Sequence, residues 1–163
     1  MLRHLFTVIV ALCAFASPSL ADIDDSRRPV LHEGRASFDS RSDDSGSNAV
    51  SIAERYIGTN PTKMRRLWCA NFVGMVEQKA GRSGSGSNMA RSYASYGKAI
   101  SRSEVKVGDI AVMSRGRRGG HVGYFAGWAD NGKAIIISGN SRGGKVWKGE
   151  YAASRIYAWR RPA

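Results

Sequence analysis

The spacing of the hydrophobic residues changes once along this chain, near residue 97. Between Asn48 and that point, apolar residues recur every three or four positions, which is typical of amphipathic helices, and three helices are predicted: 48–57, 69–80 and 88–96. Beyond it, short runs of alternating residues predict five strands: 109–114, 121–127, 134–139, 145–151 and 155–160. This order predicts an α+β fold, in which N-terminal helices pack on one face of an antiparallel β-sheet of about five strands that form a meander.

The first 21 residues have the pattern of a secretory signal peptide. Arg3 and His4 precede the apolar run Leu5–Ala16, and small residues then predict cleavage after Ala21. The apolar run is shorter than the roughly 20 residues that a helix needs to span a bilayer. We therefore expect export to the periplasm or the extracellular space, and no transmembrane segment.

Residues 22–47 differ in composition from the chain that follows. They contain four Arg, six Asp and one Glu, with apolar residues too scattered to form a face, so we predict a flexible polar leader without secondary structure. The net charge of +12 is therefore concentrated in one folded domain, residues 48–163. A strongly basic surface favours anionic partners such as anionic cell-wall polymer, although charge alone also fits a merely soluble basic protein.

Cys69 is the only cysteine outside the signal peptide, which contains Cys13, so it has no partner for an intramolecular disulfide. It begins the predicted helix 69–80, where the helix dipole favours a thiolate and predicts a lowered pKa. It also shares the apolar stripe of that helix with Phe72. Cys69 is thus a candidate nucleophile; a buried structural thiol and a disulfide-linked dimer remain as alternatives, and we expect a monomer.

His121 is the candidate base, because it begins a predicted strand between glycines, whereas His32 lies in the flexible leader. A turn at Asn131-Gly132 pairs this strand with the next, which places residue 121 opposite either 140 or 142. In both registers the side chains of His121 and Asn140 lie on the same face of the sheet. We therefore predict that Asn140 accepts a hydrogen bond from the imidazole and orients it.

Several motifs, in this order, resemble the CHAP (cysteine, histidine-dependent amidohydrolase/peptidase) family and a small secreted bacterial subgroup of it. They are Trp-Cys-Ala-x-Phe-Val at 68–73, Gly-Asp-Ile-Ala-Val at 108–112, Gly-His-Val-Gly-Tyr-Phe-Ala-Gly at 120–127, Ile-Ser-Gly-Asn at 137–140, and the closing segment 156–162. The resemblance implies a papain-like fold and cleavage of amide bonds in peptidoglycan stem peptides. It implies Cys69 as nucleophile, His121 as general base and acid, and Asn140 as orienting group, with no cofactor. Many CHAP enzymes have an acidic residue near the position of Ser138, and its absence here gives the third role to Asn140.

Three other functions are less well supported by the sequence. A zinc site needs three or four ligands, and the chain after the signal peptide offers one cysteine and one histidine on a predicted strand. Residues 139–146 match a Walker A loop except at Val146, but a strand follows instead of a helix. No recognised nucleic-acid-binding motif is present.

The main alternative to an enzyme is a non-catalytic basic module that binds the cell wall. Arginines of the 115–118 segment and Arg142 would form a basic rim, and tryptophans would stack on sugar rings. Within an enzyme, the same features predict Trp68 and Arg142 as substrate-binding residues. The opposing interpretation is that the arginines are solvated and the tryptophans belong to the core.

Overall fold

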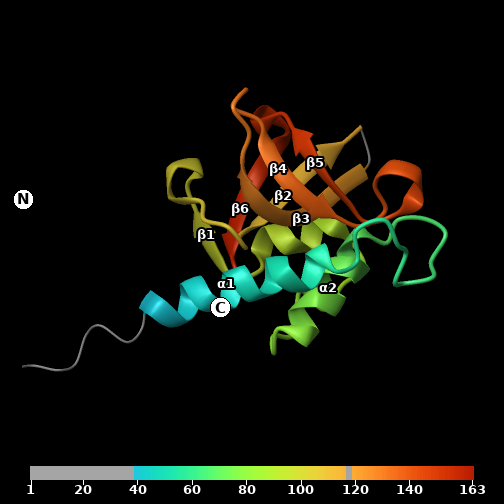
Figure 1. Cartoon of the computed structure of the whole chain (residues 1–163), viewed down its shortest axis with the longest axis horizontal. Helices are drawn as coiled ribbons and strands as arrows, with labels where there is room; N and C mark the ends of the chain where they lie inside the picture. The colour runs from blue at the N-terminus through green and yellow to red at the C-terminus, as the bar shows by residue number, and fades with distance from the viewer. Residues whose placement is uncertain (1–38, 117–118) are drawn as a thin grey trace, which may run out of the picture. The chain divides into compact units, whose positions relative to one another are not determined.

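The computed structural model describes residues 39–116 and 119–163, all of which belong to one compact unit, residues 34–163 (Figure 1). The predicted signal peptide, 1–21, and residues 22–38 of the predicted leader lie outside the described residues. Within the described part, none of the helices combines the length and the apolar character that crossing a bilayer requires.

The first helix, α1 (Asp39–Glu54), begins well before the predicted cap at Asn48. Residues 39–47, predicted to lack secondary structure, are therefore helical in this structure, and that part of the prediction is wrong. The error has a simple origin: buried residues such as Ala49 and Ile52 anchor the second half of α1 in the core, whereas the first half is polar and carries no hydrophobic period.

The second helix, α2 (Cys69–Lys79), begins where the sequence predicts and ends one residue before the predicted end, so the prediction is confirmed. Its apolar stripe includes Phe72, Val73 and Val76, none of which is exposed. Burying side chains of this size contributes on the order of 1.5–3 kcal/mol each. The third predicted helix is instead a short 3₁₀ segment, Ala90–Ser95.

The sheet of the described residues has six antiparallel strands in the order β1-β6-β2-β3-β4-β5. The strands are β1 (Lys98–Ile100), β2 (Ile110–Arg115), β3 (Gly119–Trp128), β4 (Ala134–Ser138), β5 (Trp147–Tyr151) and β6 (Ile156–Arg161). The short strand β1 was not predicted, because three residues are too few to show alternation. The meander holds from β2 to β5, but β6 crosses back to pair with β2, so the predicted meander is wrong at its last strand.

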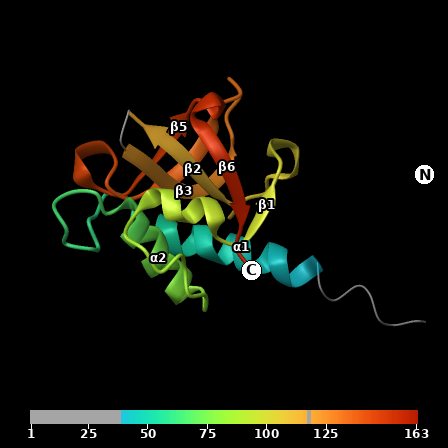
Figure 2. The ribbon, with the colours of Figure 1, turned by 180° about the vertical axis from the view of Figure 1, so that it is seen from behind.

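The helices lie on one face of the sheet, as the two opposite views show (Figures 1 and 2). The larger hydrophobic cluster fills the space between helices and sheet, and Val122 and Tyr124 of β3 belong to it. A smaller cluster that includes Met113 and Phe125 covers the other face. Because successive side chains of a strand point to opposite faces, His121 points away from the face that the helices cover.

The hairpin between β3 and β4 sets the register around the histidine. Its loop has three residues, 130–132, closed by a hydrogen bond from the Ala129 N–H to the Lys133 carbonyl, in place of the predicted two-residue turn. A bulge between Phe125 and Gly127 then shifts the register, so that Tyr124 pairs with Ile137. If continued, this register would place residue 121 opposite 140, one of the two predicted pairings, but β4 ends at Ser138.

Candidate active site

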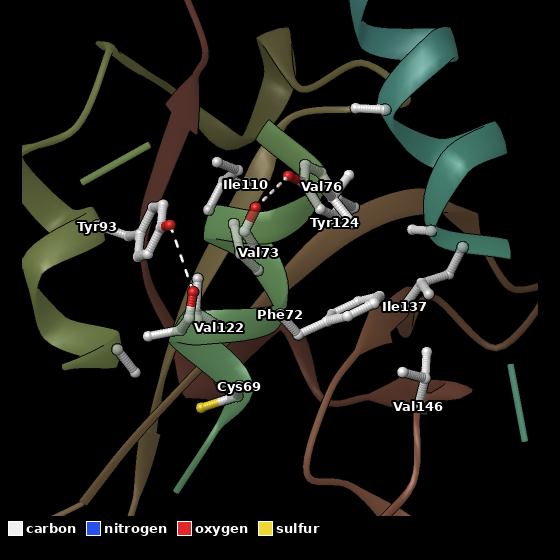
Figure 3. Packing of buried hydrophobic residues seen from close by; sticks show 14 of the residues in the cluster. Cys69, Phe72, Val73, Val76, Tyr93, Ile110, Val122, Tyr124, Ile137 and Val146 are labelled. Carbon is white, nitrogen blue, oxygen red and sulfur yellow. Dashed lines mark hydrogen bonds between the residues drawn. The ribbon is translucent and has the colours of Figure 1, made fainter. Parts of the chain in front are cut away.

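Cys69 is the first residue of α2, and its thiol lies against β3. The side chain is buried, with 4% of its surface exposed, and packs in the cluster that includes Val122 (Figure 3). The backbone of Val122 forms a hydrogen bond to the sulfur. The N–H of Val122 belongs to the peptide unit that follows His121, so the sulfur lies beside the backbone of the histidine.

Burial raises the pKa of the Cys69 thiol, and hydrogen bonding from the backbone of Val122 and of Ala70, with the charge of Arg115, opposes this effect without cancelling it. The predicted lowering of this pKa by the start of the helix is therefore wrong. The prediction took account of the helix dipole but not of the loss of hydration, which penalises the charged form more strongly at a buried site. Cys69 is thus a neutral thiol at neutral pH.

His121 is held through one of its two ring nitrogens. Its Nε2 lies 2.9 Å from the Ser138 hydroxyl and 3.2 Å from the Ser141 hydroxyl. The Tyr151 hydroxyl completes this group, at 3.3 Å from Ser138 Oγ, and its ring lies 5.9 Å from the imidazole. The other nitrogen, Nδ1, is buried and has no hydrogen-bond partner within the described residues.

Burial, with the positive charges of Arg115 and Arg155 acting in the same direction, lowers the pKa of His121 to about 4. The imidazole is therefore neutral at physiological pH. Neither Cys69 nor His121 is therefore charged at that pH, so the structure holds no preformed thiolate and imidazolium.

Asn140 does not orient the imidazole, so the predicted His121–Asn140 hydrogen bond is wrong. Asn140 follows the end of β4 with a positive φ of 51°, and its carbonyl accepts a hydrogen bond from Arg115 Nη1 at 3.3 Å. Ser138, the diagonal neighbour of His121 on the same face, takes its place. The alternation rule identified the correct face, but it does not apply beyond the last strand residue.

A glycine on β3 permits this approach of Ser138. A Cβ atom on Gly123 would lie 2.7 Å from the Cβ of Ser138, closer than side chains tolerate. Ser138 and Ser141 were not predicted as site residues. The signal that would have found Ser138 is its position two residues before Asn140, which puts both on one face of the strand.

Trp68 belongs to the core, so its predicted role in substrate binding is wrong. It is fully buried and packs edge to face against Phe72, with ring centroids 6.4 Å apart. Arg142, the other predicted binding residue, does line a hollow, where its guanidinium stacks 5.2 Å from the ring centroid of Trp147. A sequence pattern of tryptophans cannot tell a core ring from a surface ring.

Cys69 and His121 face two different hollows. Cys69 lines one of about 180 Å³ with the exposed side chains of Leu67 and Met89 and with Gly119 and Gly120 of β3. His121 lines one of about 410 Å³ on the side of β5. The thiol is therefore reachable from solvent despite its low exposure. Among the described residues, no group of three or more metal-binding side chains is found.

The comparisons with known proteins agree with this fold. Residues 60–140 match the family model described as CHAP domain. Among solved structures, the P60 domain of an antigen from M. avium paratuberculosis aligns with a TM-score of 0.56 at 10% identity, over 77% of this chain and 98% of that one. The peptidoglycan hydrolase RipB from Mycobacterium tuberculosis aligns with a TM-score of 0.57 at 18% identity, over 75% of this chain and 66% of that one.

NlpC1 from Trichomonas vaginalis aligns with a TM-score of 0.55 at 18% identity, over 71% of this chain and 43% of that one. A search of curated proteins found no significant match. At such low identities the structural likeness shows the fold alone. Residues 60–140 of the chain match the CHAP family, and the described residues have the papain-like α+β fold that the sequence predicts.

Proposed function

We propose that this protein is a cysteine hydrolase that cleaves amide bonds of peptidoglycan through a thioester intermediate. The observation that carries the proposal is the position of the Cys69 sulfur, at the start of a helix and beside the backbone of His121. The match to the CHAP family supports hydrolysis, and the peptidoglycan hydrolase RipB, which shares the fold, supports peptidoglycan as substrate.

The hydrogen bonds of His121 favour Nδ1 as the nitrogen that exchanges protons. A neutral imidazole with its proton on Nε2 donates to the Ser138 hydroxyl, which leaves the lone pair of Nδ1 free of any partner in the described residues. In this proposal Nδ1 accepts the thiol proton as the sulfur attacks the amide carbonyl carbon; because the imidazole lies on the face of β3 opposite to the helices, the proton passes through one bridging water. The resulting imidazolium then protonates the leaving amine as the C–N bond breaks.

Hydrolysis of the thioester completes the cycle. Nδ1 takes a proton from water, the hydroxide attacks the acyl carbon, and the thiolate leaves and regains the proton. The backbone N–H groups at the start of α2 are the proposed donors to the oxyanion, because the first turn of a helix leaves them without intrahelical acceptors. Losing one such donor typically costs 10²–10³ in rate.

Ser138 is the proposed orienting group in place of Asn140. A serine hydroxyl fixes the ring and its tautomer but adds no negative charge to stabilise the imidazolium. We therefore propose that His121 is a weaker base than a histidine paired with a carboxylate, and that the reaction is slower for this reason. The pKa of about 4 for His121 agrees with this, because nothing near the ring offsets its burial.

The basic surface and the N-terminal segment bear on where the enzyme acts. The signal peptide proposed for residues 1–21 would export the protein to the compartment that contains the cell wall. There the net charge of the protein without residues 1–21, which is +11 because Arg3 is lost from a total of +12, would attract anionic wall polymer and raise the local concentration of enzyme on its substrate.

The experiment is digestion of isolated peptidoglycan by the purified protein. We expect new amino groups and soluble fragments, whose masses identify the cleaved bond, and we expect Cys69→Ala to stop both. Ser51→Ala, at an exposed position of α1, is the matched control and should release fragments like the parent protein. Equal release by Cys69→Ala would remove Cys69 as nucleophile and refute the proposal.

The alternative is a non-catalytic module that binds the wall. Exposed Trp147 and stacked Arg142 favour it, since this pair is suited to contact with a sugar or an anion. Sedimentation of the protein with peptidoglycan, without release of fragments by the parent protein at any pH between 4 and 9, would support the module.

A further inference from the structure

Three arginines line the hollow of about 410 Å³ that His121 faces: Arg115 at the end of β2, Arg142 after β4 and Arg155 before β6. Trp147 and Tyr151 of β5 line the same hollow. These residues are far apart in the sequence, so the sheet brings them together around the histidine. The result is a cationic, partly aromatic hollow next to the proposed base.

None of the three guanidinium groups forms an ion pair with a carboxylate of the described residues. Elsewhere in the same part of the chain, Arg82 binds Glu77 at 2.7 Å and Arg161 binds Asp109 at 2.8 Å. The arginines of the hollow therefore differ from other well-placed arginines of this fold, because their charge is not neutralised.

The three arginines are nevertheless positioned. Arg115 donates to the Asn140 carbonyl at 3.3 Å, and Arg155 donates to the Ser114 carbonyl at 3.2 Å. Arg142 lies over the Trp147 ring, and Arg155 lies 5.9 Å from the ring centroid of Tyr151. Each guanidinium thus has fixed neighbours and unused N–H groups, which reduces the entropy lost when an anion binds.

We propose that this hollow is a subsite for a carboxylate group of the substrate, bound on the side of β3 that His121 faces. The inference rests on the proposed function and deepens it by naming an acidic peptide as the substrate class. A carboxylate fits because guanidinium groups bind it in a bidentate fashion, with two parallel N–H···O bonds. Glu150 also lines the hollow, but its carboxylate already accepts a hydrogen bond from Asn131 at 2.8 Å and forms an ion pair with Lys133 at 3.7 Å.

Binding of a carboxylate in this subsite would change the pKa of His121. Arg115 and Arg155 lower the pKa of His121, and a carboxylate bound between them would offset their charge and raise it. The other groups around the ring are the hydroxyls of Ser138, Ser141 and Tyr151, and Arg142 and Glu150 also line the hollow. A higher pKa would make His121 a stronger base once an acidic substrate is bound.

The test uses the full chain with Cys69→Ala, so that binding is measured without turnover. The probes are a peptidoglycan stem-peptide fragment with free carboxyl groups and the same fragment with those groups amidated. By calorimetry we expect the free acid to bind at least 10-fold more tightly. Arg142→Gln and Arg155→Gln, both at exposed positions, should each remove most of that difference, whereas Lys98→Gln on the opposite edge of the sheet should keep it.

A second readout is the pKa of His121, followed by NMR in the same protein. It should rise with the free acid and stay unchanged with the amide. Equal affinity for the two probes, or an undiminished preference in both arginine variants, would overturn the subsite. Tighter binding of glycerol phosphate than of the acidic fragment would also overturn it, in favour of a phosphate site.

The outcomes separate the subsite from the proposed function. If the parent protein cleaves acidic and amidated fragments with equal kcat/KM, the hydrolase stands and the subsite fails. If the Cys69→Ala protein prefers the acidic fragment but the parent protein cleaves neither, the subsite stands and the hydrolase fails.

Discussion

Two buried polar groups on α2 and β3 form a contrast: the carboxylate of Glu77, near the end of α2, and the imidazole of His121, on the face of β3 opposite to the helices. Glu77 is fully buried, and each of its oxygens accepts two hydrogen bonds. Oε1 binds Arg82 Nη2 at 2.8 Å and the Tyr124 hydroxyl at 2.7 Å; Oε2 binds Arg82 Nε at 2.7 Å and the Tyr96 hydroxyl at 2.6 Å.

His121, in contrast, is a buried group whose hydrogen-bonding capacity is only partly satisfied. One of its nitrogens has no partner in the described residues, and the arginines beside it have no carboxylate there. A satisfied buried network stabilises a fold, whereas unsatisfied polar groups cost stability and are retained where they serve another purpose. The comparison teaches that Glu77 fixes α2 to β3, through Tyr124, and that His121 retains an unpaired nitrogen, which is what the proposed base requires.

The largest expected effect is that of His121→Ala on activity. Removing the proposed base should lower kcat for peptidoglycan fragments by about 10³-fold or more, since a positioned base typically contributes 10²–10⁴. The free energy of unfolding at pH 7 should fall by only about 1–3 kcal/mol, because the substitution leaves a cavity and removes the hydrogen bonds of Nε2 but also removes a buried nitrogen that lacks a partner. Denaturant unfolding together with fragment release checks both; a large loss of stability with activity retained would reverse the comparison.

The next effect is that of Glu77→Gln on stability. The variant leaves the Arg82 side chain, 8% exposed, without its counter-charge, and breaking a buried pair in this way costs about 3–5 kcal/mol. The midpoint of urea unfolding should fall accordingly, whereas kcat per folded molecule should change little.

The control for Glu77→Gln is Lys148→Gln, which breaks an exposed ion pair with Glu54. We expect it to change the unfolding free energy by no more than about 0.5 kcal/mol. If Glu77→Gln were as mild as this control, the carboxylate would not be the structural link that we infer.

The third effect is the response to pH. The pKa of His121 is lowered to about 4 in the folded protein from an ordinary value of 6.5, so the unfolded chain binds a proton that the folded one excludes. The unfolding free energy should therefore fall as the pH drops from 6.5 to 4, by on the order of 3 kcal/mol in total. His121→Gln should remove this slope, measured as the difference between the two proteins.

The pH dependence of activity should also reflect the ionisation of His121. Because the base form of His121 is required, kcat/KM should rise through an acidic limb near pH 4 and not near 6.5. A limb near 6.5 would mean that the ring is more solvated, or closer to a negative charge, than the structure indicates.

The smallest effects on activity are expected for Ser138→Ala and Asn140→Ala. Ser138→Ala removes one hydrogen bond to Nε2 but leaves the Ser141 hydroxyl at 3.2 Å, so kcat should fall by about 10-fold. In Asn140→Ala the kcat should fall by less than in Ser138→Ala, because the Asn140 side chain makes no hydrogen bond to the ring. A larger loss in Asn140→Ala would restore the role predicted from the sequence.

The sequence predicted the face of each strand better than the ends of the strands. Alternation correctly put the imidazole and the 138–140 segment on one face, but it could not reveal that β4 stops at Ser138 and that Asn140 turns away with a positive φ. Burial was the other gap: Trp68 was expected to bind substrate and Cys69 to have a lowered pKa, but both residues are buried, and burial raises the pKa of Cys69. Such packing depends on contacts distant in sequence, which no local pattern encodes.

The central claim is that Cys69 attacks an amide carbonyl and retains the acyl group. The most direct measurement is peptide mapping by mass spectrometry after the protein and a stem-peptide fragment are mixed and quenched in acid within milliseconds to seconds. The account predicts a peptide that contains Cys69 and carries the mass of the acyl fragment. Cleavage of the same fragment without any adduct at Cys69, and at an undiminished rate in Cys69→Ala, would contradict it.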